Sequence, residues 1–159
     1  MVTAVVLSGG GSLGAIQVGM LLALADRHVV PDVYVGTSVG AINAAFLAGR
    51  PGLQGLEKLA HIWTQLTRHD IFPTGPARLL RAAVGREAGF ADPKPLRTLI
   101  DRHLTYRRLE DAQLPITVVA TDVITGQEVQ LSHGTAIDAV MASAALPAVF
   151  PPVRSTTTS

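Results

Sequence analysis

The fold is decided by residues 3–48, TAVVLSGGGSLGAIQVGMLLALADRHVVPDVYVGTSVGAINAAFLA. Two short apolar runs in it, residues 3–8 and 33–35, have the length and composition of buried strands. Each run leads into a glycine-containing turn and then into a segment with helical spacing, over residues 15–27 and 39–48. Such alternation of strand and helix places successive strands in a parallel sheet with right-handed crossovers. The segment therefore predicts an α/β fold.

The rest of the chain extends this pattern toward the C-terminus. The expected elements are an amphipathic helix over residues 53–67, strands over 116–120 and 128–131, and a final helix over 135–145. Between them, residues 73–108 are more basic, with Arg78, Arg81 and Arg86 set among apolar residues. A solvated arginine face is the simpler interpretation, and peripheral contact with a membrane surface is the alternative.

Composition narrows the class of protein. The chain has 159 residues, of which 48% are hydrophobic and 16% are charged. This predicts one domain over residues 1–153, followed by an unstructured polar tail over 154–159. The net charge of +1 implies no nucleic-acid partner, and the absence of cysteine excludes disulfides and thiolate chemistry. The start carries no basic segment before its apolar run, so we expect no secretory signal and a cytoplasmic location.

The first glycine motif is GGGSLG, residues 9–14, between a predicted strand and a predicted helix. Backbone N–H groups and the helix dipole converge at such a turn and can hold a phosphate or an oxyanion. The motif also satisfies the dinucleotide pattern G-x-G-x-x-G, which makes a nucleotide-binding domain one alternative. In that pattern an acidic residue follows the second strand, whereas Asp32 precedes it here.

The second motif, GTSVG, places Ser38 between Gly36 and Gly40 at the next strand-to-helix turn. Small residues two positions to either side allow strand and helix to pack closely and leave the serine hydroxyl above the sheet edge. The alternative role of Ser38 is an N-cap of the helix that follows. The position of the motif beside the first glycine turn favours a nucleophile. A serine nucleophile needs a base, and a Ser38–Asp122–His133 triad is a less favoured possibility.

The sequence resembles the patatin-like phospholipase family. The similarity is carried in order by LSGGGSLGAIQVGMLLAL, VGTSVGAINAA, VVATDVITGQEV and IDAVMASAALPAVFPPV, and it covers residues 4–153. The final segment, residues 142–153, is a third match that is independent of the two glycine motifs. The resemblance implies a three-layer α/β fold with a central, mostly parallel sheet flanked by helices.

The resemblance also implies a chemistry. Ser38 would be the acyl-accepting nucleophile, and the backbone N–H groups of Gly10, Gly11 and Ser12 would form the oxyanion hole. The motif glycines are Gly9, Gly14, Gly36 and Gly40. The substrate would be a lipid or another fatty-acyl ester, hydrolysed through an acyl-enzyme without a metal or another cofactor.

Two departures from the family pattern stand out. Leu13 occupies a position where many members carry Arg or Lys. The family's catalytic aspartate lies in an Asp-Gly-Gly or Asp-Gly-Ala motif, and this sequence contains no Asp-Gly dipeptide. We therefore expect a member truncated before that motif, without the strand and helix that follow it and with apolar sheet surface exposed. Such a chain could be inactive, and a non-catalytic lipid-binding or regulatory remnant is the alternative function.

Overall fold

The computed structural model describes residues 1–66 and 93–145. Its strands are β1 (Ala4–Leu7), β2 (Val33–Thr37), β3 (Ile116–Thr121) and β4 (Glu128–Leu131). Its helices are η1 (Gly11–Leu13), α1 (Gly14–Ala25), α2 (Val39–Ala48), α3 (Leu53–Gln65), α6 (Lys94–His103), η2 (Leu109–Asp111) and α7 (Ala136–Ala144). Every strand and helix predicted from the sequence is present, and each boundary lies within two residues of its expected position.

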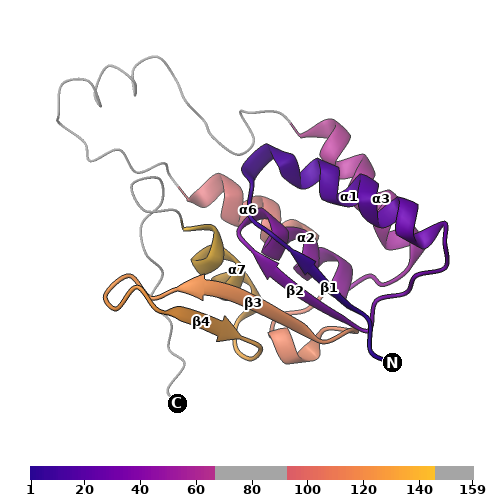
Figure 1. Cartoon of the computed structure of the whole chain (residues 1–159). Helices are drawn as coiled ribbons and strands as arrows, with labels where there is room; N and C mark the ends of the chain where they lie inside the picture. Colours follow the sequence, from indigo (N-terminus) through magenta and orange to yellow (C-terminus); the bar gives the residue numbers. More distant parts are fainter. Residues whose placement is uncertain (67–92, 146–159) are drawn as a thin grey trace.

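The strands form one sheet in the order β1-β2-β3-β4 (Figure 1). β1, β2 and β3 run parallel to one another, whereas β4 pairs antiparallel with β3. The predicted α/β fold, a mostly parallel sheet flanked by helices, is therefore confirmed. Because the three parallel strands all end at the same edge of the sheet, the turns that follow β1 and β2 are neighbours there.

The core lies between one face of the sheet and helices α2 and α7. Leu7, Tyr34, Ile116 and Val118 point to this face and are buried. α2 contacts the sheet and also α1, α3 and α7, so it is buried along almost its whole length. This position explains why the sequence of α2 is apolar on every side rather than along one stripe.

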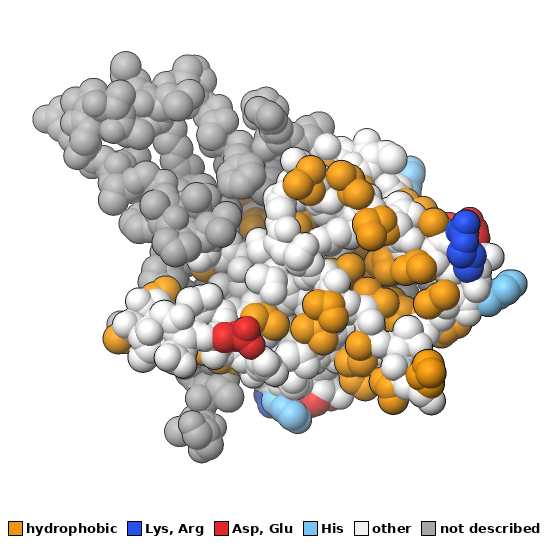
Figure 2. All heavy atoms as spheres, in the orientation of Figure 1, with side chains coloured by type: hydrophobic (Ala, Val, Ile, Leu, Met, Phe, Trp, Pro, Cys, Tyr) orange, Lys and Arg blue, Asp and Glu red, His pale blue; other side chains and the backbone are white. Residues whose placement is uncertain are grey.

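An apolar surface lies over α1 and β1 (Figure 2). Val6 of β1 is 71% exposed, and Ile16 and Met20 of α1 are 59% and 62% exposed. The residues of α1 that are buried are Gly14, Val18 and Leu21. α1 therefore packs through part of its surface and leaves several of its large apolar side chains exposed in the described part of the chain.

Helix α6 was not expected from the sequence, which predicts only a loose basic stretch over residues 73–108. Its buried residues, Leu96 and Ile100, are four positions apart and lie on one face of the helix. Pro95 stands in the first turn, where proline is well tolerated. The charged residues around Leu96 and Ile100 favoured the prediction of a loop. The four-residue spacing of these two apolar residues and the position of Pro95 could have indicated the helix.

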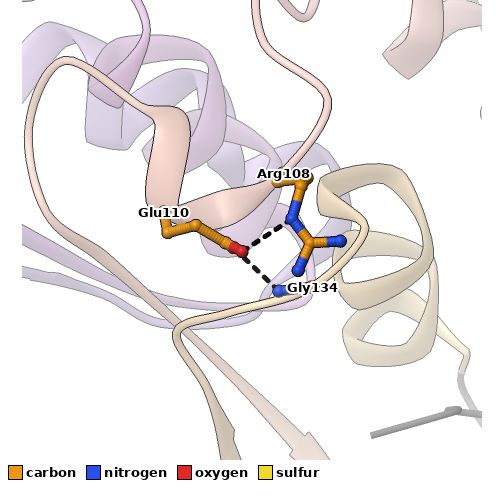
Figure 3. A network of polar contacts seen from close by, with 3 residues as sticks. All are labelled: Arg108, Glu110 and Gly134. Atoms are coloured by element: carbon orange, nitrogen blue, oxygen red, sulfur yellow. Dashed lines mark hydrogen bonds and ion pairs between the residues drawn. The ribbon is translucent and has the colours of Figure 1, made fainter.

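A small polar network holds the turn that precedes α7 (Figure 3). Glu110 accepts hydrogen bonds from the Arg108 side chain at 2.7 Å and from the Gly134 N–H at 2.8 Å. Backbone hydrogen bonds, first the one within Glu110 itself and then the one from Gly134, lower the pKa of this carboxyl from 4.5 to about 2, and Arg108 adds to the effect. The charged form of Glu110 is thus favoured by folding.

This shift predicts how stability depends on pH. The pKa of Glu110 is lower in the folded chain than in the unfolded chain, so its contribution is complete above the unfolded value of about 4.5 and is lost as the pH falls toward about 2. Urea unfolding of the wild-type chain and a Glu110→Gln variant is expected to show the wild type more stable near neutral pH. The difference should shrink through this window. A difference that stays constant down to about pH 2 would contradict this assignment.

Several predicted features lie outside the described residues. These are the basic segment with Arg78, Arg81 and Arg86, the tail over residues 154–159, and most of the segment over 142–153, of which the structure describes only the first four residues. Among the helices that the structure does describe, none has both the length and the apolar character required to cross a membrane.

Candidate active site

The two glycine motifs meet at one edge of the sheet. β1 and β2 are paired neighbours, with Leu7 opposite Gly36, so the turns that follow them lie side by side. Gly9 faces Ser38 directly, because a Cβ added to Gly9 would lie 3.4 Å from the Cβ and 4.0 Å from the Oγ of Ser38. The structure therefore brings Ser38 and the loop over residues 9–14 together, as their positions in the sequence suggested.

Ser38 occupies a strained turn. Its backbone angles are φ 55° and ψ −123°, and among the described residues only His28 is another non-glycine residue with positive φ. Such a conformation costs about 1–3 kcal/mol and persists only where the surroundings hold it. Ser38 stands at the N-cap position of α2 but makes no side-chain capping bond. Capping therefore does not explain the serine, and its hydroxyl stays available for other chemistry.

Three glycines allow the close packing behind this turn. A Cβ on Gly36 would lie 2.5 Å from the carbonyl oxygen of Gly40. A Cβ on Gly40 would lie 2.1 Å from the carbonyl oxygen of Leu7, and a Cβ on Gly14 would lie 2.5 Å from the Cγ2 of Val39. All three distances are shorter than any ordinary contact with a methyl group. The backbone of α2 thus lies against β1 and β2, and the Val39 side chain of α2 lies against α1, at distances that only glycine permits.

The loop between β1 and α1 presents free hydrogen-bond donors. Gly10 and Gly11 have φ values of 155° and 57°, which favour glycine, and residues 8–13 are exposed. Within residues 1–66 and 93–145, the N–H groups of residues 10–12 have no hydrogen-bond acceptor, whereas the N–H of Leu13 donates to the Gly10 carbonyl. Unpaired N–H groups at the N-terminal end of a helix attract negative charge. The loop can therefore stabilise an anion next to Ser38.

A buried asparagine, which is not among the site residues predicted from the sequence, fixes this loop. Asn43 of α2 is fully buried, and its amide donates to the Gly14 carbonyl and to the Gln17 side chain, both at 3.0 Å. Its Oδ1 accepts from the Trp63 indole at 3.0 Å. Gln17 in turn donates to the Ser8 carbonyl at 2.7 Å. Asn43 thus ties the start of α1 and the end of β1 to α2, the helix that follows Ser38.

The structure separates the members of the alternative triad. β4 runs antiparallel to β3 and Leu131 pairs with Val118, so His133 lies at the opposite edge of the sheet from Ser38. That offset is about four strand residues, or roughly 13 Å. Asp122 accepts the N–H groups of Ile124 and Thr125 at 2.9 Å or less. These bonds, the one from Thr125 with the larger effect, lower the pKa of the carboxyl. Asp122 is therefore a turn residue, and the triad is not formed.

Two other carboxylates have structural partners. Asp138 of α7 forms an ion pair with Arg97 of α6 at 2.8 Å. Asp32, the acidic residue considered for dinucleotide binding, accepts the Thr3 N–H at 2.7 Å. Asp32 lies before β2, at the sheet edge opposite to the glycine loop, so it cannot contact a nucleotide bound at that loop. The geometry therefore does not favour the nucleotide-binding alternative.

Comparison with known proteins gives a consistent set of relatives. The family model described as patatin-like phospholipase matches residues 5–158. An uncharacterized NTE family protein of Mycobacterium tuberculosis is 29% identical over 94% of this chain and 39% of its own length. Patatin-like phospholipase domain-containing protein 7 of Rattus norvegicus is 28% identical over 94% of this chain and 11% of its own length. The chain thus spans less than half of these curated relatives.

Solved structures share the fold. VipD from Legionella pneumophila aligns with a TM-score of 0.67 at 16% identity, covering 97% of this chain and 44% of that one. Full-length ExoU of Pseudomonas aeruginosa, solved in complex with SpcU, aligns with a TM-score of 0.61 at 19% identity. That alignment covers 94% of this chain and 39% of the solved one.

Proposed function

The chain belongs to the patatin-like phospholipase family, and on that premise we propose that it provides the nucleophile and the oxyanion hole of a lipid acyl hydrolase. Ser38 is the nucleophile, and the N–H groups of residues 10–12 bind the oxyanion. The observation that carries this proposal is the strained Ser38 turn facing Gly9, beside backbone donors that lack an acceptor in the described chain. An uncapped hydroxyl next to free N–H groups is the arrangement that acyl transfer requires.

The reaction proceeds in two steps. Ser38 Oγ attacks the carbonyl carbon of a fatty-acyl ester and loses its proton to a base, and the carbonyl oxygen becomes an oxyanion held by the loop. Collapse of this intermediate expels the alcohol and leaves the acyl group on Ser38. Water then attacks the acyl-enzyme, releases the fatty acid and restores the serine. The donors of the loop stabilise charge that develops only in the transition states, so they accelerate both steps.

The base is the part of this mechanism that the described residues do not supply. Within the two described ranges, no carboxylate or imidazole forms a hydrogen bond with Ser38, and Asp122 and Asp138 serve a turn and an ion pair. General-base catalysis contributes about 10²–10⁴ to the rate. A missing base slows both acylation and deacylation, so we expect slow steady-state turnover and look for acylation of Ser38 in single-turnover experiments with an activated ester.

Covalent labelling tests the proposal directly. The chain is incubated with an alkyl fluorophosphonate and digested, and the adduct is mapped by mass spectrometry. One adduct per chain is expected on Ser38, with Ser8, Ser12 and Ser143 unmodified as hydroxyl controls from the same region. An adduct on another residue would show that Ser38 is not the nucleophile. No adduct, together with saturable binding of a fatty acid, would replace the proposal with the non-catalytic lipid-binding function.

A further inference from the structure

The side chain of Ser143, in the last turn of α7, lies between the Ser38 turn and β3. The N–H of Ser38 donates to the Ser143 Oγ at 2.7 Å, and the Ser143 hydroxyl donates to the Val119 carbonyl at 2.5 Å. The direction of both bonds is fixed, because a backbone N–H can only donate and a carbonyl can only accept. Ser143 therefore uses its one proton on Val119 and offers a lone pair to Ser38.

This hydroxyl replaces a missing connection between two parallel strands. The Tyr34 N–H donates to the Pro115 carbonyl, and the register pairs Tyr34 with Ile116. Parallel ladders repeat every two residues, so the same pattern continued for four residues would join the Ser38 N–H directly to the Val119 carbonyl. In the structure the Ser143 Oγ stands between these two groups. The Ser143 hydroxyl allows β2 to separate from β3 at Ser38, where the chain turns into α2. The Ser38 N–H and the Val119 carbonyl both still have a hydrogen-bond partner.

We propose that Ser143 is a positioning residue that holds the Ser38 turn in its strained conformation. This inference rests on the proposed function of Ser38. A positive φ at a serine is maintained only when neighbouring groups determine the peptide orientation, and the bond from Ser143 determines the orientation of the Ser38 N–H. Without the hydroxyl, the N–H is free to rotate toward the Val119 carbonyl. The Ser38 Oγ would then move away from Gly9 and the donors of residues 10–12.

Ser143 is not needed merely to hold α7 in place. α7 is anchored at its start by the Ala136 N–H, which donates to the Arg107 carbonyl at 2.8 Å, and by the Arg97–Asp138 ion pair. Five of its residues are buried in the core. These contacts do not involve Ser143. Ser143 also lies in the third segment of family similarity, residues 142–153. The proposed function assigned no role to that segment, and the hydroxyl of Ser143 supplies one for its start.

A matched pair of variants isolates the hydroxyl. Ser143→Thr keeps the hydroxyl and adds a methyl group. Ser143→Val introduces a side chain of the same shape as threonine but without the hydroxyl. The rate of fluorophosphonate labelling of Ser38 is expected to be near wild type with threonine and about 10- to 100-fold lower with valine. Ser132→Ala serves as a control, because it removes another half-buried hydroxyl, bonded to Thr117 at 3.0 Å, that does not contact Ser38. Circular dichroism melting establishes that each variant is folded.

Equal labelling rates for the threonine and valine variants would overturn the proposal. If the valine variant is unfolded at the assay temperature, Ser143→Ala adds no bulk and makes the same comparison with the wild-type chain. Amide hydrogen exchange of Ser38, followed by NMR, gives a readout that does not require a reactive serine. Exchange is expected to be at least about tenfold faster with valine than with threonine. Unchanged exchange would refute the positioning role, whereas faster exchange in a chain that is never labelled would refute only the proposed function.

Discussion

Replacement of Ser38 with alanine is expected to abolish the transfer of an acyl group from an activated ester to the chain. With p-nitrophenyl butyrate, the wild-type chain is expected to release up to one equivalent of p-nitrophenolate in a first turnover that precedes slower steady-state release. The Ser38→Ala variant should show no such burst, and its first-turnover rate should fall by about three orders of magnitude or more. The reason is chemical, because alanine has no oxygen that can form the ester bond of the intermediate.

A matched control is available in the neighbouring loop. The hydroxyl of Ser12 makes no hydrogen bond within the described residues, and the proposed role of Ser12 is that of a backbone donor. Ser12→Ala should therefore keep the burst and change its rate by less than about threefold. A burst that persists in the Ser38→Ala variant would remove Ser38 from the mechanism. A burst lost on Ser12→Ala would show that the side chain of this residue, and not its N–H, acts in the reaction.

Replacement of Gly40 with alanine is expected to destabilise the whole domain. The new methyl group would lie 2.1 Å from the Leu7 carbonyl oxygen and 2.6 Å from that of Ser8. Both are backbone atoms of the β1 segment and cannot swing aside as a flexible side chain would. Relief of this overlap requires α2 to move away from β1, which opens the core, so the free energy of unfolding should fall by about 3 kcal/mol or more. Urea unfolding followed by circular dichroism measures this change.

The same change of glycine to alanine at Gly19 is expected to have the opposite effect on the free energy of unfolding. Gly19 lies inside α1, and an added Cβ would meet no atom within 4 Å. Alanine there lowers the entropy of the unfolded chain and favours the helix, which is expected to raise the free energy of unfolding by about 0.5–1 kcal/mol. Equal effects at Gly19 and Gly40 would contradict the close approach of α2 to β1.

Local spacing in the sequence was sufficient to predict much of the fold. The strand-to-helix alternation over residues 3–48 and the two glycine turns depend on neighbouring residues, and the structure has β1, α1, β2 and α2 in that order. Helix α6 was missed because its two buried residues are only about one turn apart, and the charged residues around them suggested a loop. The position of Ser38 beside Gly9 followed from the parallel sheet, since neighbouring parallel strands end at the same edge.

The residues that support the site could not be predicted in the same way. Ser38 and Ser143 are 105 residues apart in the chain, and Asn43 lies 29 residues from Gly14, so their hydrogen bonds depend on how the elements pack. Asn43 did leave one signal, because it is the one polar residue in the apolar sequence of α2. A lone amide in a buried helix requires partners, but the sequence does not say which groups supply them.

The hydrogen bond between the Trp63 indole and Asn43 has a practical consequence. Trp63 is the only tryptophan in the chain, and its ring lies against Gly14, where a Cβ would come within 2.6 Å of it. Indole fluorescence responds to the polarity and hydrogen bonding of its surroundings, so this ring is an intrinsic optical reporter placed at the base of the loop over residues 9–14. Any ligand that shifts the loop would register as a change in emission wavelength, without an attached dye and without turnover.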